Sequence, residues 1–132
     1  MTSLTVQRIM HRDPVTTTPW DTLASAQSVM EREGYRQLPV VDKGMLVGIL
    51  SDRDLHAHSG YLERTKVDAA MTDRLISVTP ADTAAHTARV LLEHRINAVP
   101  VVDDGRLIGI VSRSDLLHLL LELVEGQGEK GS

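Results

Sequence analysis

The feature that most constrains the fold of this chain is an internal repeat. When the sequence is shifted by 61 positions against itself, 19 of the 50 residues from 6 to 55 are identical to their counterparts from 67 to 116, without a gap. The segment PVVD occurs at 39–42 and again at 100–103, and SDRDL at 51–55 matches SRSDL at 112–116. The chain is therefore a tandem duplication of one unit.

Each repeat contains the same series of helix and strand signals. Thr18-Pro19-x-Asp21 and Thr79-Pro80-x-Asp82 predict helix starts, because a capping Thr, a Pro in the first turn and a later Asp suit that position. The helices that follow have apolar residues at helical spacing, which are Leu23, Ala26 and Met30 in the first repeat and Ala84, Ala88 and Leu91 in the second.

Two apolar strands follow in each repeat, joined by the turn segments DKG and DDG, and this pattern predicts a hairpin. A second helix is predicted to begin after Ser51 or Ser112, which gives the order β-α-β-β-α. A unit of about 55 residues buries too little surface to be stable alone. The prediction is an α/β (α+β) fold of two tandem β-α-β-β-α units, packed sheet to sheet with pseudo-twofold symmetry.

The repeat also predicts how the chain is divided. We expect a first unit at 1–58, a polar connector at 59–66, a second unit at 67–125 and a disordered tail at 126–132.

Composition excludes several classes of function. The 14 Lys and Arg residues against 18 Asp and Glu argue against a nucleic-acid partner, and the absence of Cys excludes thiolate chemistry. No stretch approaches the roughly 20 apolar residues of a membrane span, so we expect no membrane association and a cytoplasmic location. No phosphate loop, catalytic triad order or metal-ligand spacing is present, so we expect no enzyme activity and no metal site.

Two units that read hPVVDxGxLhGhhSxxDL, each preceded by M…T-P-x-D-T, resemble a pair of cystathionine beta-synthase (CBS) domains over about residues 6–120. The resemblance implies a regulatory module that binds AMP, ADP or ATP in clefts between the two units, with S-adenosylmethionine or NADH as alternative ligands. No other cofactor is implied. It also implies a homodimer and a regulated partner protein that the sequence does not name.

The repeated Ser-x-x-Asp segments at 51–54 and 112–115 have two interpretations. In the first, Ser and Asp form a capping box at the start of a helix and have no other role. In the second, which the resemblance favours, the same helix start faces a ligand. Asp115 would then accept hydrogen bonds from ribose hydroxyls, while Ser112, Ser114 and the helix N-terminus hold phosphate.

The resemblance implies the remaining residues of each cleft. The first cleft would contain Gln7, Met10, Arg12, Tyr35, Arg36, Ser112, Ser114 and Asp115, with Tyr35 beside adenine and the two arginines near phosphate. The second would contain Ser51, Arg53, Asp54, Asp68, Met71, Asp73, Ile96 and Asn97. Asp68 and Asp73 would repel phosphate, so we expect one nucleotide per chain, in the first cleft.

The last predicted helix has an unusually apolar surface. In LLHLLLELV, residues 116–124, only His118 and Glu122 are polar, and their spacing puts them on one face. A stripe of this size on a soluble chain is typical of an interface, which predicts that the helix takes part in a homodimer. The alternative function is a structural or dimerisation module whose clefts are vestigial.

Overall fold

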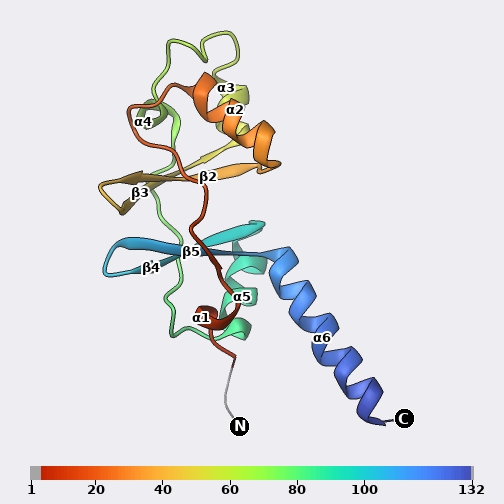
Figure 1. Ribbon diagram of the computed structural model, residues 1–132. Coiled ribbons are helices and arrows are strands. Elements are labelled where there is room, and N and C mark those ends of the chain that lie inside the picture. Colours follow the sequence, from red (N-terminus) through yellow and green to blue (C-terminus); the bar gives the residue numbers. More distant parts are fainter. Residues whose placement is uncertain (1–3, 132) are drawn as a thin grey trace. The chain divides into compact units, whose positions relative to one another are not determined.

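The structure is a computed structural model that describes residues 4–131, with side chains described from 4 to 126. Figure 1 shows the elements in chain order, and their bounds are α1 (Val6–Ile9), β1 (His11–Arg12), α2 (Leu23–Glu33), β2 (Gln37–Asp42), β3 (Met45–Ser51), α3 (Asp52–Ala57), α4 (Val67–Ala70), α5 (Ala84–His94), β4 (Ala98–Asp103), β5 (Arg106–Ser112) and α6 (Arg113–Gly131).

The two repeats fold into the same series of elements, as predicted. Each has a short helix, an extended segment, a helix of 11 residues, a hairpin and a final helix. The first extended segment is β1 in one repeat and a single bridge between Thr72 and Ile49 in the other. The predicted α/β class with two tandem units is confirmed.

The predicted helix starts are wrong by about one turn. Helix α2 is capped by Thr22, whose side chain accepts a hydrogen bond from the Ser25 N–H, and α5 is capped in the same way by Thr83. The Thr-Pro-x-Asp segment forms a turn of its own, in which Asp21 accepts a hydrogen bond from the Thr18 N–H at 3.0 Å. Because the Asp side chain already accepts from the Thr18 N–H, these four residues form a separate turn before the helix begins.

The hydrophobic core lies against the long helix and hairpin of each repeat. Leu23, Ala26 and Met30 are buried, as predicted for α2. On α5 the buried residues are Leu91 and Thr87, whereas Ala84 and Ala88 are only half-buried. The apolar pattern did not predict the burial of Thr87, because threonine is polar. Its hydroxyl donates to the Thr83 carbonyl at 3.0 Å, which satisfies it inside the core.

The compact units of the fold do not follow the repeats. One unit, called unit 1, contains residues 4–13, 76–103 and 108–131, and the other, unit 2, contains residues 14–75 and 104–107. Each unit is therefore most of one repeat together with the opening segment of the other. The predicted boundaries, with units at 1–58 and 67–125, assign these opening segments to their own repeats.

Matched hydrogen bonds attach each opening segment to the opposite repeat. The Val6 N–H donates to the Asp82 carbonyl at 2.8 Å, and the Val67 N–H donates to the Asp21 carbonyl at 2.8 Å. Val6 is fully buried in the core of unit 1, and Val67 is fully buried in the core of unit 2. Helices α1 and α4 thus complete the core of the repeat to which they do not belong.

Both predicted hairpins are present. Strand β2 is antiparallel to β3, and β4 pairs with β5. The central turn residues, Lys43-Gly44 and Asp104-Gly105, all have positive φ, between 53° and 84°. Two successive residues of this kind match the type I′ turn, whose twist suits a two-residue hairpin.

Helix α6 is longer than predicted. It continues from Arg113 to Gly131, so residues 126–131 are helical where a disordered tail was expected, and Ser132 lies outside the described residues. Among the described residues, no helix is both long enough and apolar enough to cross a membrane.

Candidate ligand site

The starts of helices α3 and α6 are closed by reciprocal hydrogen bonds. The Ser112 N–H donates to Asp115 Oδ2 at 2.8 Å, and the Asp115 N–H donates to Ser112 Oγ at 3.1 Å. Ser51 and Asp54 make the same pair of bonds, at 2.8 Å and 3.3 Å. A capping box is therefore present at both positions.

Capping leaves part of the Asp115 carboxylate available. Within the described part of the chain, only Oδ2 of this half-buried side chain accepts a hydrogen bond, and Oδ1 accepts none. An ionised carboxylate has about four acceptor positions. Asp115 can therefore cap α6 and accept a hydrogen bond from a second group at the same time, so the capping box leaves room for a ligand contact.

Unit 1 brings together six of the residues predicted for the first cleft. Strand β1 pairs with β5 so that Arg12 lies opposite Gly109, and α1 packs against α6. Gln7, Met10 and Arg12 thus belong to the same compact unit as Ser112, Ser114 and Asp115. Their positions follow from the attachment of residues 4–13 to the second repeat.

Glycine at position 109 permits the close approach of this opening segment. A Cβ atom added at Gly109 would lie 2.8 Å from Met10 Sδ and 2.9 Å from the His11 carbonyl oxygen. In unit 2, a Cβ at Gly48 would lie 2.5 Å from Met71 Sδ. Met10 and Met71, both half-buried, therefore pack directly over the strand that leads to each capped helix.

Tyr35 and Arg36, which were predicted to group with Asp115, belong to unit 2. The Asp52 N–H donates to the Arg36 carbonyl at 2.9 Å, which joins Arg36 to the start of α3. In unit 1 the corresponding neighbour of α6 is Asn97, whose carbonyl accepts from the Arg113 N–H at 2.8 Å. Within each unit, the residue before the hairpin therefore lies beside the start of the helix that follows the hairpin.

The hairpin register explains this arrangement. Gln37 lies opposite Ser51, so the residue before β2 must lie beside the helix that follows β3. The same geometry adds Arg113 to the site, because its Nε donates to the Ile96 carbonyl at 3.3 Å. Sequence reasoning missed Arg113, although the hairpin signal contained the register that places it.

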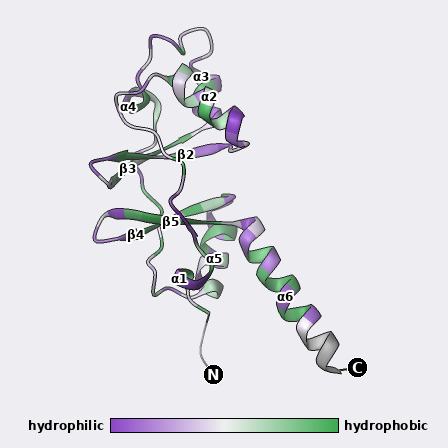
Figure 2. Cartoon of the chain, viewed as in Figure 1, coloured by the Kyte–Doolittle hydropathy of each residue, from purple (hydrophilic) through white to green (hydrophobic). Residues whose placement is uncertain are grey.

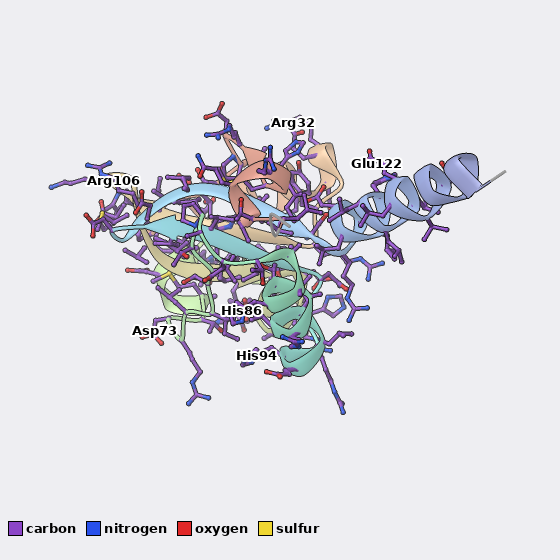
Figure 3. All side chains as sticks on the ribbon, turned by 90° about the horizontal axis from the view of Figure 1, so that it is seen from below. Arg32, Asp73, His86, His94, Arg106 and Glu122 are labelled. Atoms are coloured by element: carbon purple, nitrogen blue, oxygen red, sulfur yellow. The ribbon has the colours of Figure 1, made fainter. Side chains whose placement is uncertain are left out.

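The two sets of site residues differ in charge. Unit 2 has Asp68, Asp73 and Asp52 where unit 1 has Gln7, Arg12 and Arg113. In the opposite sense, unit 2 has Arg36 and Arg53 where unit 1 has Asn97 and Ser114. All of these residues are exposed, and Figure 3 labels Asp73 among them. The balance makes the unit 1 set the more favourable one for an anion.

No group of three or more His, Cys, Asp or Glu side chains is arranged to hold a metal ion among the residues that the structure describes. His86 and His94, for example, are separated along α5 (Figure 3).

A family model described as the CBS domain matches residues 6–59 and 67–122, which are the two repeats. The chain belongs to the CBS domain family. The CBS domain-containing protein YhcV of Bacillus subtilis is 32% identical over 114 residues, covering 84% of this chain and 81% of YhcV.

Solved structures of CBS-pair proteins superpose closely on this chain. CBSX2, a protein of Arabidopsis thaliana, is 30% identical in its complex with AMP, with a TM-score of 0.84 and coverage of 91% of this chain and 98% of CBSX2. The CBS domain pair of protein MJ0100, in complex with 5′-methylthioadenosine and S-adenosylmethionine, is 27% identical, with a TM-score of 0.79 and coverage of 90% and 97%.

Proposed function

We propose that this CBS pair is a regulatory module that binds an adenine nucleotide at unit 1 and acts on a partner protein. The ligand site consists of Gln7, Met10, Arg12, Ile96, Asn97, Ser112, Arg113, Ser114 and Asp115. The observation that carries the proposal is the carboxylate of Asp115, which caps α6 and keeps Oδ1 available for the ribose hydroxyls.

The adenosine part of the ligand is supported by the relatives. CBSX2 binds AMP, and the MJ0100 pair binds two other adenosine compounds. In this chain Met10 and Ile96 are half-buried and pack against the core of unit 1, so they supply the apolar surface that an adenine ring needs.

The phosphate part is supported by charge. Arg12 and Arg113 are exposed on unit 1, and the N-terminus of the 19-residue helix α6 offers the positive end of its dipole. At unit 2, Asp52, Asp68 and Asp73 oppose an anion. We therefore propose unit 2, with Tyr35, Arg36, Ser51, Arg53, Asp54 and Met71, as the weaker site.

Calorimetric titration with AMP and ATP tests this proposal. Asp115→Ala removes the ribose acceptor, and a hydrogen bond to a charged group is worth roughly 1.5–3 kcal/mol, so affinity should fall about tenfold to a hundredfold. Asp54→Ala is the matched control, because it removes an equivalent cap from unit 2. Loss of binding in the Asp54 variant alone would contradict the assignment.

We also propose that the protein is a homodimer in which α6 takes part. Leu117, Leu120, Leu121, Leu123 and Val124 are all at least half exposed, and this observation favours a dimerisation role as well. A thermal-shift screen with AMP, ATP, NADH and S-adenosylmethionine separates the two functions. A ligand at a hundred times its Kd stabilises by about 2.7 kcal/mol, and no shift with any of them would favour the purely structural module.

A further inference from the structure

We infer that the two units select adenosine compounds of opposite charge, so that unit 2, the weaker site for a nucleotide, binds a cationic adenosine compound. This inference rests on the function proposed above and names the ligand class of the second site. S-adenosylmethionine is the probe for this class, because its sulfonium and ammonium groups together outweigh its carboxylate.

The opening segments of the two repeats are held in the same way, which makes the two sites comparable residue by residue. The Gln7 N–H donates to the Pro80 carbonyl at 3.0 Å, and the Asp68 N–H donates to the Pro19 carbonyl at 3.1 Å. Asp68 therefore has the same place in unit 2 that Gln7 has in unit 1.

The position of Asp73 follows from a backbone bridge beside strand β3. Thr72 and Ile49 exchange two hydrogen bonds of 2.9 Å, and this bridge matches the pairing of His11 with Ile110 in unit 1. The residue after Thr72 is Asp73, at the position that matches Arg12. An anion therefore replaces a cation beside the strand that leads to each capped helix.

The two sets of site residues consequently differ in net charge. The unit 2 set contains two Arg and four Asp, whereas the unit 1 set contains two Arg and one Asp, so their formal charges are −2 and +1. Within the described part of the chain, an ion pair joins Arg32 to Glu33, and no carboxylate of the unit 2 set is in one. The electrostatic potential at unit 2 therefore favours a cation. The four carboxylates belong to Asp52, Asp54, Asp68 and Asp73.

Tyr35 gives unit 2 an aromatic surface that the unit 1 set lacks. Its side chain is 44% exposed, and Ile96 is the residue at the matching position. The carbonyl of the next residue, Arg36, accepts from the Asp52 N–H at 2.9 Å, which places Tyr35 beside the start of α3. The face of a Tyr ring attracts cations, including those of ligands. The aromatic ring and the carboxylates thus favour a ligand of the same sign.

The acceptor for the adenosine ribose is common to both sites. Strand β3 is hydrophobic (Figure 2), and the polar residues of the unit 2 set begin where it ends. There Asp54 Oδ2 accepts from the Ser51 N–H and Oγ at 2.8 and 3.0 Å, while Oδ1 accepts no hydrogen bond within the described residues. Asp54 can therefore accept from ribose hydroxyls as Asp115 can, and charge distinguishes the two ligands.

Calorimetry with S-adenosylmethionine and S-adenosylhomocysteine tests the role of charge. The second compound lacks the methyl group that makes the sulfur cationic, and the two are otherwise alike. The natural chain should bind the sulfonium about fivefold to tenfold more tightly than the thioether. Equal affinities for the two compounds would overturn the inference.

Substitutions in unit 2 test which residues read that charge. Asp73→Asn should lower the affinity for S-adenosylmethionine about fivefold, and Tyr35→Ile, which copies unit 1, about threefold. Glu63→Gln is the matched control, because Glu63 is an exposed carboxylate of unit 2 outside the site. If Glu63→Gln weakened binding as much as Asp73→Asn, only the net charge of the chain would matter and the assignment would be wrong.

Titration with both ligands separates this inference from the function on which it rests. AMP at saturation should not displace S-adenosylmethionine, and Asp54→Ala should lose the sulfonium whereas Asp115→Ala should lose AMP. Failure of AMP to bind at all would contradict the proposed function. If AMP bound through Asp115 but S-adenosylmethionine either did not bind or was displaced by AMP, the proposed function would stand and the charge selection would be overturned.

Discussion

The two compact units offer a comparison that the duplication itself provides. They share the same elements, the same I′ hairpin turns and the same reciprocal caps at Ser51 and Ser112. They differ mainly in exposed charge, because Asp68 and Asp73 replace Gln7 and Arg12. Backbone hydrogen bonds and core packing keep the fold common, whereas exposed positions are free to diverge. The difference teaches that one scaffold can carry two sets of exposed residues that differ in charge.

The core of each unit contains a valine from the opening segment of the other repeat. Removing these two valines is the first test of the comparison. Val6→Ala and Val67→Ala each delete the equivalent of two buried methylene groups at positions that are fully buried. Each should destabilise the protein by about 2 kcal/mol, from the lost transfer free energy and the small cavity.

Hydrogen exchange measures where that loss occurs. Val6→Ala should increase exchange in residues 76–103 and 108–111, which belong to the unit that Val6 completes, and Val67→Ala should do so in residues 14–57. If each variant instead increased exchange only in its own repeat, the packing of α1 and α4 on the opposite repeats would be contradicted. Thr16→Ala, at an exposed position, is a suitable control and should leave stability nearly unchanged.

Exchanging a pair of charges should reduce the electrostatic difference between the units. Arg12→Asp should weaken ATP binding at unit 1, and Asp73→Arg should strengthen binding at unit 2, by about fivefold to tenfold each, because an exposed charge contributes about 1 kcal/mol. Calorimetry at low and high salt is the measurement, and the effect should shrink as salt rises.

Adenosine, which lacks phosphate, is the control ligand for this pair of variants. Its affinity should be nearly the same in both. An equal loss of adenosine and ATP binding in Arg12→Asp would mean that Arg12 supports the site sterically and not through its charge.

Acid stability should distinguish the matched turn residues Asp21 and Asp82. Burial alone would raise the pKa of Asp21, but hydrogen bonds from Thr18 and Thr17 and the nearby charge of Lys66 outweigh it and lower the pKa below the usual 3.8. Asp82 accepts from the Thr79 N–H, but Val78 replaces the hydroxyl that Thr17 supplies to Asp21.

The sign of the effect follows from the lowered pKa. A group whose folded pKa is lower than its unfolded pKa stabilises the fold above the unfolded value and loses that contribution as pH falls through the folded value. Asp21→Asn should therefore cost about 1 kcal/mol at pH 7 and less below pH 4, in urea unfolding. Asp82→Asn should cost less at pH 7, and an equal cost for both variants would contradict the role of Thr17.

Sequence reasoning predicted the local caps at the helix starts more directly than the segments that pack beside them. The Ser112 and Asp115 cap could be predicted because a capping box depends only on hydrogen bonds within the four residues Ser-x-x-Asp. The segments that pack beside that cap could not be predicted in the same way. Arg36 was grouped with Asp115, whereas the hairpin register places its carbonyl beside Asp52. Local hydrogen-bond patterns extend over a few residues, and contacts between segments distant in sequence need the register as well.

By itself, the sequence determined the duplication, the order of elements, the hairpin turns and the two capped helix starts, because each depends on interactions within one short segment. Only the tertiary structure decided that Val6 and Val67 complete each other's repeats and that Thr87 is buried. The reason is that burial and long-range hydrogen bonding select among arrangements that are locally equivalent. An opening segment such as residues 4–13 has the same local preferences on either repeat, and only the packing of its apolar side chain against a complete core fixes the partner.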